Sequence, residues 1–228
     1  MSSRSWRVLE KEDARHRLAG RPPDCGWVEQ MPPFLRDFSR PGDLVVYPFC
    51  GWGTTLVACA LEGRRGIGLE IEPARAAAAR ERLKAYAGPD QKVLTAEAGK
   101  PPLRAASVDF CLTNIPYFGA DWAAGREGQL YRKTEYAKYL EELEAVFFAM
   151  ARVLKPGAHI VAMAENIVLS DGKFVPLAWD AARALSRHFT LLPERLLCYR
   201  RPLPKDPDPA RTNRAHEYAL IGKKDSVQ

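Results

Sequence analysis

The sequence of 228 residues contains no long apolar run. None of its apolar stretches approaches the roughly 18 residues that a helix needs to span a bilayer. The segment from Met1 to Arg21 is polar and charged, and it lacks the apolar core of a secretory signal. We therefore expect a cytoplasmic protein that does not enter a membrane.

Paired cysteines are also missing. The five cysteines are scattered and odd in number, none are spaced as Cys-x-x-Cys, and no histidine cluster joins them. This pattern argues against both a disulfide framework and a zinc site. We expect reduced, mostly buried thiols and no bound metal. The cysteines are Cys25, Cys50, Cys59, Cys111 and Cys198.

Charge is present, but it is unevenly placed. The formal net charge of +6 is by itself compatible with ordinary solubility. Basic side chains, however, are concentrated in residues 4–21 and 195–214. Basic segments near both ends of the chain would suit a polyanionic partner such as a nucleic acid.

Short β-type runs alternate with amphipathic helical stretches along most of the chain. Strands are predicted at 44–47, 66–71, 93–96, 108–113 and 159–163. Helices are predicted at 28–38 (with an interruption near its start), 54–62, 73–86, 136–154 and 176–188. This alternation predicts an α/β fold, with a mainly parallel twisted sheet and helices on both faces.

The two ends of the chain depart from the alternation. Residues 191–199 and 217–221 predict two final strands, which we expect to form a C-terminal antiparallel hairpin across a long basic loop. Residues 1–26 lack clear periodicity and are expected to form an N-terminal arm that is ordered only in part. The remaining residues, 27–228, are predicted to form a single domain.

A glycine-containing loop follows the first predicted strand of the sheet. Phe49-Cys50-Gly51-Trp52-Gly53-Thr54-Thr55 joins that strand to a helix, where glycines let the backbone approach a ligand closely. Glu70 ends the next strand, and a carboxylate at that place can accept hydrogen bonds from both hydroxyls of a ribose. Together these features predict a nucleoside cofactor site, whereas a bare Gly-x-Gly would indicate only a tight turn.

The loop differs from the known phosphate-binding loops. A single residue separates Gly51 from Gly53. The third glycine that a dinucleotide fingerprint would have three positions further on is absent. The loop also lacks the Gly-Lys-Thr of a nucleotide triphosphate loop. A cofactor without a pyrophosphate therefore fits the sequence better.

A second motif, Asn114-Ile115-Pro116-Tyr117, follows the fourth predicted strand. Alone, such a tetrapeptide is more often a turn at a strand end with a core tyrosine. Its position after the glycine loop, at the end of a strand of the same sheet, favours a catalytic role.

Both motifs resemble those of the amino-methylating DNA methyltransferases, the N6-adenine and N4-cytosine group. Residues 42–55 and 66–73 are similar to that family's cofactor blocks, and the tetrapeptide is similar to its (Asp/Asn/Ser)-Pro-Pro-(Tyr/Phe) motif. With Ile in second place it looks even more like the motif of rRNA adenine dimethyltransferases. The resemblance implies a Rossmann-like methyltransferase fold and S-adenosyl-L-methionine as cofactor.

The resemblance also implies the cofactor site. In the family the glycine loop cradles the methionine part of the cofactor, the acid at Glu70 holds the ribose, and a residue at Glu97 lies near the adenine ring. The chain departs from the family at Tyr47, where Asp is usual, and at Trp52, where a small residue is usual. The implied cofactor residues are Tyr47, Phe49, Cys50, Gly51, Gly53, Thr54, Thr55, Glu70, Ile71 and Glu97.

The catalytic motif suits methylation of an exocyclic amine, which is a poor nucleophile because its lone pair is delocalised into the ring. As in the family, the Asn114 side-chain oxygen and the Ile115 carbonyl would accept the amine hydrogens and localise that lone pair. Pro116 would stiffen the loop, and Tyr117 would stack on the target base. In duplex DNA that base must first be flipped out of the stack.

The substrate side is less defined by sequence. Phe118 is expected to line the pocket, and four basic residues are expected to bind nucleic acid: Arg200, Arg201, Lys205 and Arg214. No large target-recognition insertion is present. Sequence readout is therefore expected from short loops, the basic segment, a second copy of the chain or an accessory recognition subunit.

Three functions remain open at this point. The first is a DNA amino-methyltransferase, of the kind found in restriction-modification systems, with adenine N6 favoured over cytosine N4 because relatives with Asn or Asp first tend to act on adenine. The second is an RNA base methyltransferase, favoured by Ile115 and by the missing recognition domain. The third, motivated by Tyr47 and Trp52, is a non-catalytic nucleic-acid-binding protein on a methyltransferase scaffold.

Overall fold

The computed structural model describes residues 5–10, 12–18, 20, 25–86, 88, 90–119, 129–200 and 216–226. Its centre is an eight-stranded sheet with the order β1-β9-β10-β6-β5-β2-β3-β4. The strands are β1 (Trp6–Leu9), β2 (Leu44–Tyr47), β3 (Arg65–Glu70), β4 (Gln91–Thr95), β5 (Val108–Asn114), β6 (Leu154–Ala164), β9 (Thr190–Tyr199) and β10 (His216–Lys223).

The sheet is mainly parallel, as the sequence predicts. Strands β2, β3, β4, β5 and β6 pair in parallel with their neighbours, whereas β10 is antiparallel to both β6 and β9. The predicted C-terminal antiparallel pair is thereby confirmed, and β10 is inserted between β9 and β6. The loop that joins β9 to β10 lies outside the described residues.

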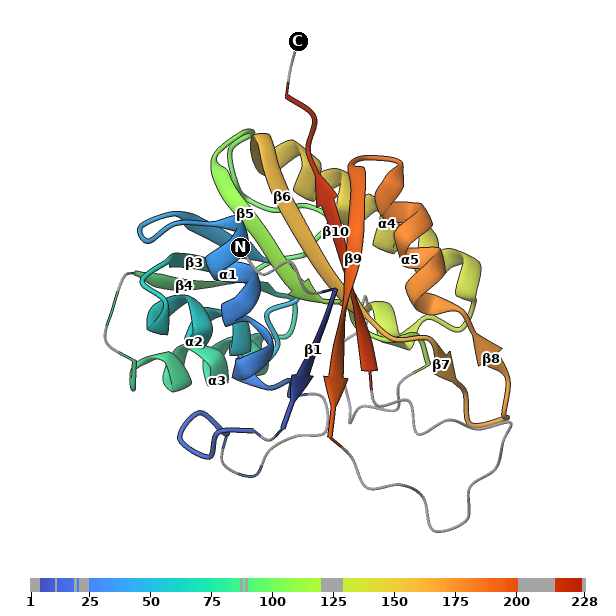
Figure 1. Ribbon diagram of the computed structural model, residues 1–228, viewed down its shortest axis with the longest axis horizontal. Helices are drawn as coiled ribbons and strands as arrows, with labels where there is room; N and C mark the ends of the chain where they lie inside the picture. Colours follow the sequence, from blue (N-terminus) through green and yellow to red (C-terminus); the bar gives the residue numbers. More distant parts are fainter. Residues whose placement is uncertain are drawn as a thin grey trace.

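Helices cover both faces of the sheet (Figure 1). One face carries α1 (Pro32–Phe38), α2 (Thr54–Leu61) and α3 (Pro73–Leu83), and the other carries α4 (Tyr136–Val153) and α5 (Leu177–Ser186). Each layer buries its own apolar cluster against the sheet. The fold is therefore a three-layer α/β fold of the Rossmann-like kind.

The sequence explains why these elements form. In α4 the apolar residues recur at helical spacing, so that Leu143, Phe147 and Met150 lie on one buried stripe. In β5 the apolar run is buried on both sides, because helices cover both faces of a parallel sheet. Pro73 occupies the first turn of α3, where its missing N–H is not needed.

Two expectations about boundaries are wrong. The strand predicted at 159–163 begins earlier, because β6 starts at Leu154 and runs through Pro156 and Gly157. The pairing of β6 with β5 shifts register at this place, and Gly157 adopts a positive φ of 76°. Such a bulge accommodates a proline that cannot donate a ladder hydrogen bond. Helix α3 also ends at Leu83, before the predicted Tyr86.

The predicted N-terminal arm contributes an edge strand. β1 pairs in parallel with β9, from Trp6 opposite Leu196 to Leu9 opposite Tyr199. Its isolated four residues carry no strand periodicity that a sequence pattern could detect. A short hairpin of β7 (Ile167–Val168) and β8 (Phe174–Val175) and two short 3₁₀ helices, η1 (Val28–Gln30) and η2 (Leu130–Arg132), complete the described structure.

Among the residues that the structure describes, no helix combines the length and apolarity needed to cross a membrane. The same part of the chain holds no cluster of three or more side chains that could bind a metal ion. Four of the five cysteines are buried, and Cys198 is half-buried.

Candidate active site

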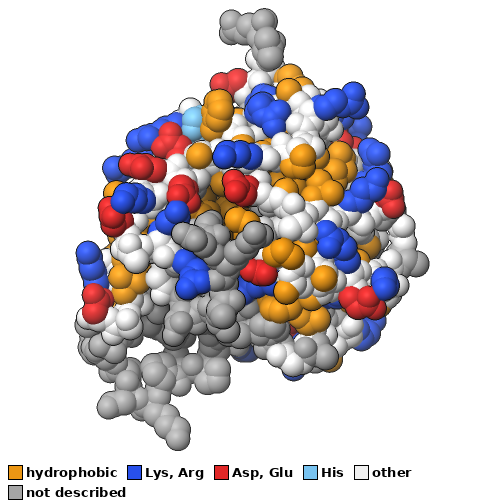
Figure 2. Space-filling view, turned by 180° about the vertical axis from the view of Figure 1, so that it is seen from behind, with side chains coloured by type: hydrophobic (Ala, Val, Ile, Leu, Met, Phe, Trp, Pro, Cys, Tyr) orange, Lys and Arg blue, Asp and Glu red, His pale blue; other side chains and the backbone are white. Residues whose placement is uncertain are grey.

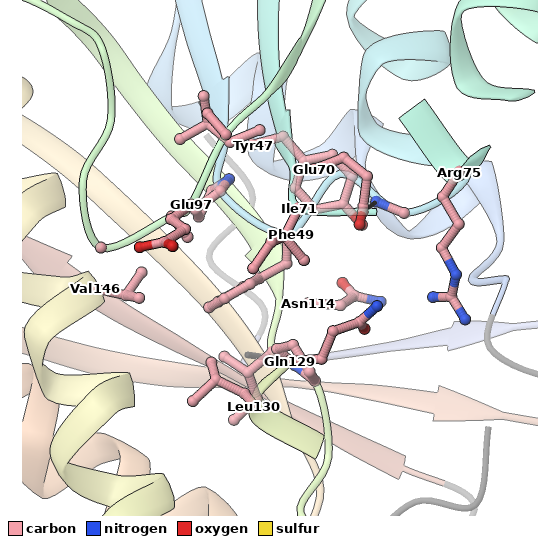
Figure 3. Close-up of a pocket in the computed structure, with 18 of the residues that line it drawn as sticks. Tyr47, Phe49, Glu70, Ile71, Arg75, Glu97, Asn114, Gln129, Leu130 and Val146 are labelled. Carbon is pink, nitrogen blue, oxygen red and sulfur yellow. Dashed lines mark hydrogen bonds between the residues drawn. The ribbon is translucent and has the colours of Figure 1, made fainter. Parts of the chain in front are cut away.

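One cavity of about 520 Å³ opens at the carboxyl ends of β2, β3 and β5. Gly51, Glu70 and Asn114 all line it, so the glycine loop, the acid after the second strand and the tetrapeptide meet in one place. Figure 3 shows Glu70, Glu97 and Asn114 arranged around this cavity. Parallel strands expose their carboxyl ends at a common edge, which is why motifs far apart in sequence converge there.

The glycine loop turns sharply because two of its glycines take left-handed backbone angles. Gly51 has φ of 50° and Gly53 has φ of 78°, values that other residues rarely adopt. The Gly53 N–H donates to the Cys50 carbonyl (2.8 Å), and a Cβ on Gly53 would lie 3.3 Å from the Cβ of Ala79. Gly53 thus lets α2 start close against α3, and Gly51 presents bare backbone to the cavity.

Glu70 fixes the same loop from the neighbouring strand. Its Oε2 accepts the Gly51 N–H (2.7 Å), and its Oε1 accepts the Glu72 N–H (2.8 Å). The side chain is 7% exposed, and this burial raises the pKa of the Glu70 carboxyl, while the two backbone donors and Arg75 oppose the shift. Each carboxylate oxygen has a second lone pair, so the group can still accept hydrogen bonds from a ligand.

The two residues that depart from the family pattern both line the cavity. Tyr47 is buried, and this burial raises the pKa of its hydroxyl far above the ordinary range. Trp52 lies beneath the guanidinium of Arg75, whose Cζ is 5.5 Å from the ring centroid. This cation–π pair gives the site a cationic rim beside the glycine loop. Neither residue closes the cavity.

Asn114 stands at the end of β5 with its backbone held in the sheet. It pairs with Met163, and the next N–H, of Ile115, donates to the Met163 carbonyl (3.0 Å). The Pro116 carbonyl accepts the Tyr139 hydroxyl from α4 (2.7 Å). With the backbone anchored on both sides, the Asn114 Oδ1 is buried and has no hydrogen-bond partner among the described residues.

The two aromatic residues after Pro116 lie outside the cavity lining. The half-buried Tyr117 donates its hydroxyl hydrogen bond to Glu217 Oε1 (3.1 Å), and burial raises the pKa of that hydroxyl well above its usual value. Phe118 packs edge-on against Tyr136 and Tyr139, with ring centroids 5.1 and 5.6 Å apart. The stacking of Tyr117 on a base and the contact of Phe118 with substrate stay predictions.

The other predicted cofactor residues divide into two groups. Those on the cavity wall are Tyr47, Phe49, Gly51, Thr54, Glu70, Ile71 and Glu97. Those behind the loop, outside the lining, are Cys50, Gly53 and Thr55, and the Thr55 hydroxyl there contacts Met31 Sδ (3.5 Å). The second group shapes the loop instead of facing a ligand.

Of the four predicted nucleic-acid-binding residues, the structure describes only Arg200. Arg200 is exposed and forms an ion pair with Glu10, so it joins β9 to the segment after β1. Arg201, Lys205 and Arg214 lie outside the described residues. On the face shown in Figure 2, Lys and Arg side chains are spread over the surface with Asp and Glu between them.

Sequence reasoning missed several lining residues. They come from the N-terminal segment, from the start of η2 and from α4: Cys25, Gly26, Gln129, Leu130, Lys133, Glu142, Ala145 and Val146. Packing between distant segments brings them to the cavity, and no local motif marks them. Gln129 is an uncharged polar residue, and its burial is visible only in the structure.

The comparisons with known proteins agree with this geometry. The sequence model of a family described as DNA methylase, of the N6/N4 type, matches residues 8–81, which contain the glycine loop and Glu70. Over these residues the chain is similar to the DNA amino-methyltransferase family. It is 35% identical over 80 residues to the type II methyltransferase M.MjaII of Methanocaldococcus jannaschii.

A second relative is named for a different substrate. The tRNA (guanine(10)-N2)-dimethyltransferase of Methanothermobacter thermautotrophicus is 33% identical over 95 residues. These two matches cover 35% and 41% of this chain, which spans only 15% and 28% of the length of the two relatives.

Solved structures share the fold across nearly the whole chain. A SAM-dependent methyltransferase from Methanosarcina mazei aligns over 86% of this chain and 98% of its own, with a TM-score of 0.59 and 13% identity. A Haloferax volcanii putative methyltransferase, solved in complex with the Trm112 methyltransferase activator, aligns over 88% and 87% with a TM-score of 0.56 and 16% identity. At such low identities these neighbours show the fold alone.

The family and the fold imply S-adenosylmethionine as the cofactor, and the cavity residues fit it. The Gly51 backbone leaves room for the methionine part, and Glu70 retains acceptor capacity for ribose hydroxyls. A volume of about 520 Å³ lies within the ordinary range of ligand pockets. Asn114 Oδ1 adds an unpaired acceptor in the same space.

Proposed function

We propose that this protein is a methyltransferase that methylates an exocyclic amino group of a DNA base, with adenine N6 favoured over cytosine N4. The observation that carries the proposal is the buried Oδ1 of Asn114, which lines the same cavity as Gly51 and Glu70 and has no hydrogen-bond partner among the described residues. An unpaired buried acceptor costs free energy, and a donor on a substrate would remove that cost.

The tetrapeptide acts as an acceptor for the amine. Asn114 Oδ1 and the Ile115 carbonyl accept the two amine hydrogens, which pyramidalises the nitrogen and localises its lone pair. The sheet and the bond from Tyr139 to Pro116 hold the loop before the base arrives, so little reorganisation is needed. Asn is not a base, and the amine becomes acidic enough to lose its proton to water after methylation.

The cofactor supplies an electrophilic methyl group when it is bound. Glu70 holds the ribose hydroxyls, and Gly51 leaves its backbone accessible to the methionine part. Glu97 lies at the far wall of the cavity, where its 60% exposed side chain pairs with Lys100 at 4.0 Å. These residues orient the methyl donor, while the Asn114 loop orients the base amine that receives the methyl group.

DNA is favoured as substrate because the matching family is described as DNA methylase and one relative is named a type II methyltransferase. Adenine is favoured because Asn stands first in the tetrapeptide. A base in duplex DNA must leave the stack to reach the buried Asn114 acceptor, at a cost of a few kcal/mol. A second copy of the chain or an accessory subunit would supply recognition.

A second candidate substrate is an RNA base. It is favoured by the relative named as a tRNA guanine-N2 dimethyltransferase and by Ile115 in the tetrapeptide. Guanine N2 is also an exocyclic amine, so the chemistry of Asn114 applies to it unchanged. Only the polymer and the base differ.

The test is a product analysis. The protein is incubated with S-adenosylmethionine labelled in the methyl group and with either genomic DNA or total RNA, and nucleosides are then identified by mass spectrometry. Labelled N6-methyladenine in DNA supports the proposal, and a labelled methylated base in RNA supports the second candidate. Cofactor binding by calorimetry without methylation of either polymer would favour a non-catalytic nucleic-acid-binding protein.

A further inference from the structure

Gln129 is a buried polar residue on the cavity wall that none of the motifs includes. It precedes η2, and its backbone carbonyl accepts the Arg132 N–H (3.1 Å), but its side chain does not cap the helix. The residue is 7% exposed, and its Nε2 is buried without a hydrogen-bond partner in the described part of the chain. Its side-chain donor is therefore buried in the binding site without a protein acceptor.

Gln129 and Asn114 form a complementary pair. Both line the same cavity, and in the view of Figure 3 the amide of Gln129 reaches toward that of Asn114. The donor Nε2 and the acceptor Oδ1 nevertheless do not bond to each other, since both lack partners. A ligand that carries a donor and an acceptor on one edge would satisfy both groups at once.

Adenine and cytosine have such an edge. The exocyclic amine is the donor, and the ring nitrogen bonded to the same carbon is an acceptor: N1 beside N6 in adenine, and N3 beside N4 in cytosine. Adenine N7 has no counterpart in cytosine, so a protein donor that serves both bases must face N1 or N3. Thymine and uracil present the opposite pattern, a carbonyl oxygen and an N–H, to the same two amides.

We propose that Gln129 is a base-reading residue, whose Nε2 donates to the ring nitrogen adjacent to the amine that Asn114 grips. This inference rests on the proposed function and deepens it by naming what selects an amine-bearing base. Gln129 orients the Watson–Crick edge of the flipped base so that its amine faces the methyl donor, and it rejects thymine and uracil.

The first experiment removes the ring nitrogen and leaves the protein unchanged. A single-stranded oligonucleotide that spans a site methylated in genomic DNA is prepared with adenine, 1-deazaadenine or 7-deazaadenine at the target. We expect the 1-deaza base to lower kcat/KM about 10-fold, the effect of one lost hydrogen bond, and the 7-deaza base to change it by less than about 2-fold. If cytosine is the methylated base, 3-deazacytosine takes the place of 1-deazaadenine.

The second experiment removes the donor. Gln129→Leu is expected to lower kcat/KM on adenine about 10-fold and to show no further loss on the 1-deaza base, because the bond is already absent. The Kd for S-adenosylmethionine should stay within about 2-fold of the wild type. Gln129→Glu keeps the shape of the side chain without its N–H donors, and it gives the same answer if the Leu variant fails to fold.

A matched control tests for loss of fold. Gln91→Leu removes the same type of side chain from β4, where Nε2 donates to the Arg64 carbonyl (2.7 Å) away from the cavity lining. This variant should still lose about 10-fold on the 1-deaza base, as the wild type does.

Each remaining outcome decides the matter. If the 1-deaza base lowers kcat/KM by the same factor in the wild type and in Gln129→Leu, the inference is overturned, because another group then reads the ring nitrogen. A large rise in the cofactor Kd for Gln129→Leu overturns it too, because Gln129 then belongs to the cofactor side. A wild type that methylates neither DNA nor RNA refutes the proposed function itself, and the unmodified oligonucleotide reveals this first. If an RNA base is the substrate, the analogue that lacks the acceptor ring nitrogen beside the methylated amine is placed in an RNA oligonucleotide.

Discussion

The hydroxyl of Tyr117 donates a hydrogen bond to the carboxylate of Glu217 (3.1 Å), which ties the loop after β5 to the start of β10. Glu217 is 7% exposed and accepts further hydrogen bonds from Gln30 Nε2 (2.7 Å) and from the Tyr199 hydroxyl. Gln30 Oε1 in turn accepts the Trp27 N–H (2.9 Å). One buried carboxylate therefore joins the tetrapeptide, η1 and the C-terminal strand pair.

Replacing this carboxylate should destabilise the fold. Glu217→Leu leaves the donors of Tyr117, Tyr199 and Gln30 without their acceptor, so the free energy of unfolding should fall by about 3 kcal/mol. Glu217→Gln keeps one oxygen acceptor and should lose less. Urea denaturation followed by circular dichroism measures both. Glu194→Leu, on the exposed side of β9, is the control, and an equal midpoint for Glu217→Leu and this control would contradict the role of the network.

Truncating Asn114 should stop the reaction while sparing the cofactor. Asn114→Ala removes the acceptor for the amine, and a loss of about 100-fold or more in kcat is expected for a preorganised group that acts on developing charge. Calorimetry should give an unchanged Kd for S-adenosylmethionine, because Glu70 and the glycine loop are intact. Asn166→Ala serves as a matched control, since its Oδ1 accepts the Ala178 N–H at the start of α5. Retained turnover in Asn114→Ala would remove Asn114 from the active site.

Cofactor affinity should weaken as the pH falls. Burial raises the pKa of Glu70, so its carboxylate is protonated at a higher pH than an exposed glutamate and loses acceptor capacity for ribose hydroxyls. The Kd for S-adenosylmethionine should therefore rise as the pH is lowered from 7 through this raised pKa. Glu70→Gln should bind more weakly at pH 7 and respond little to pH below 7, and a wild-type Kd that is flat over that range would argue against the assignment.

The same pKa shift determines how the stability of the fold changes with pH. Because the folded state holds the Glu70 proton more tightly than the unfolded chain, the contribution of this group to stability is fully present below the ordinary glutamate pKa of 4.5. It is lost as the pH rises through the raised folded pKa. Removing the charge by Glu70→Gln should therefore flatten this part of the stability profile above pH 4.5.

Arg82 should hold the N-terminal segment against the cofactor loop. Its guanidinium donates to the Trp52 carbonyl (2.9 Å) and to the His16 carbonyl (2.7 Å). Arg82→Met should reduce the free energy of unfolding by about 1–2 kcal/mol and speed proteolytic cleavage within residues 5–20. Arg80→Met is the matched control on the same helix, because Arg80 donates to Val93 and Thr95 of β4 and not to the arm. Equal cleavage rates for the two variants would count against this bridge.

The elements of the sheet could be predicted because their signals are local. The apolar run of β2, the left-handed glycines that follow it and the acid at the end of β3 each lie within a few residues of chain. Turn chemistry and periodicity are enough to place them. The bulge at Pro156 and the strand β1 were missed, because each depends on pairing with a partner strand far along the chain.

By itself the sequence determined the alternation of the main strands and helices from β2 onward, the site at the carboxyl ends of the strands, and the residue types available there for a cofactor and an amine. Tertiary structure alone decided which side chains face the cavity. It turned the hydroxyl of Tyr117 to Glu217, packed Phe118 between tyrosines, and brought Gly26 and Gln129 to the cavity wall. The physical reason is that the direction of a loop side chain depends on contacts with segments remote in the sequence, which no local pattern encodes.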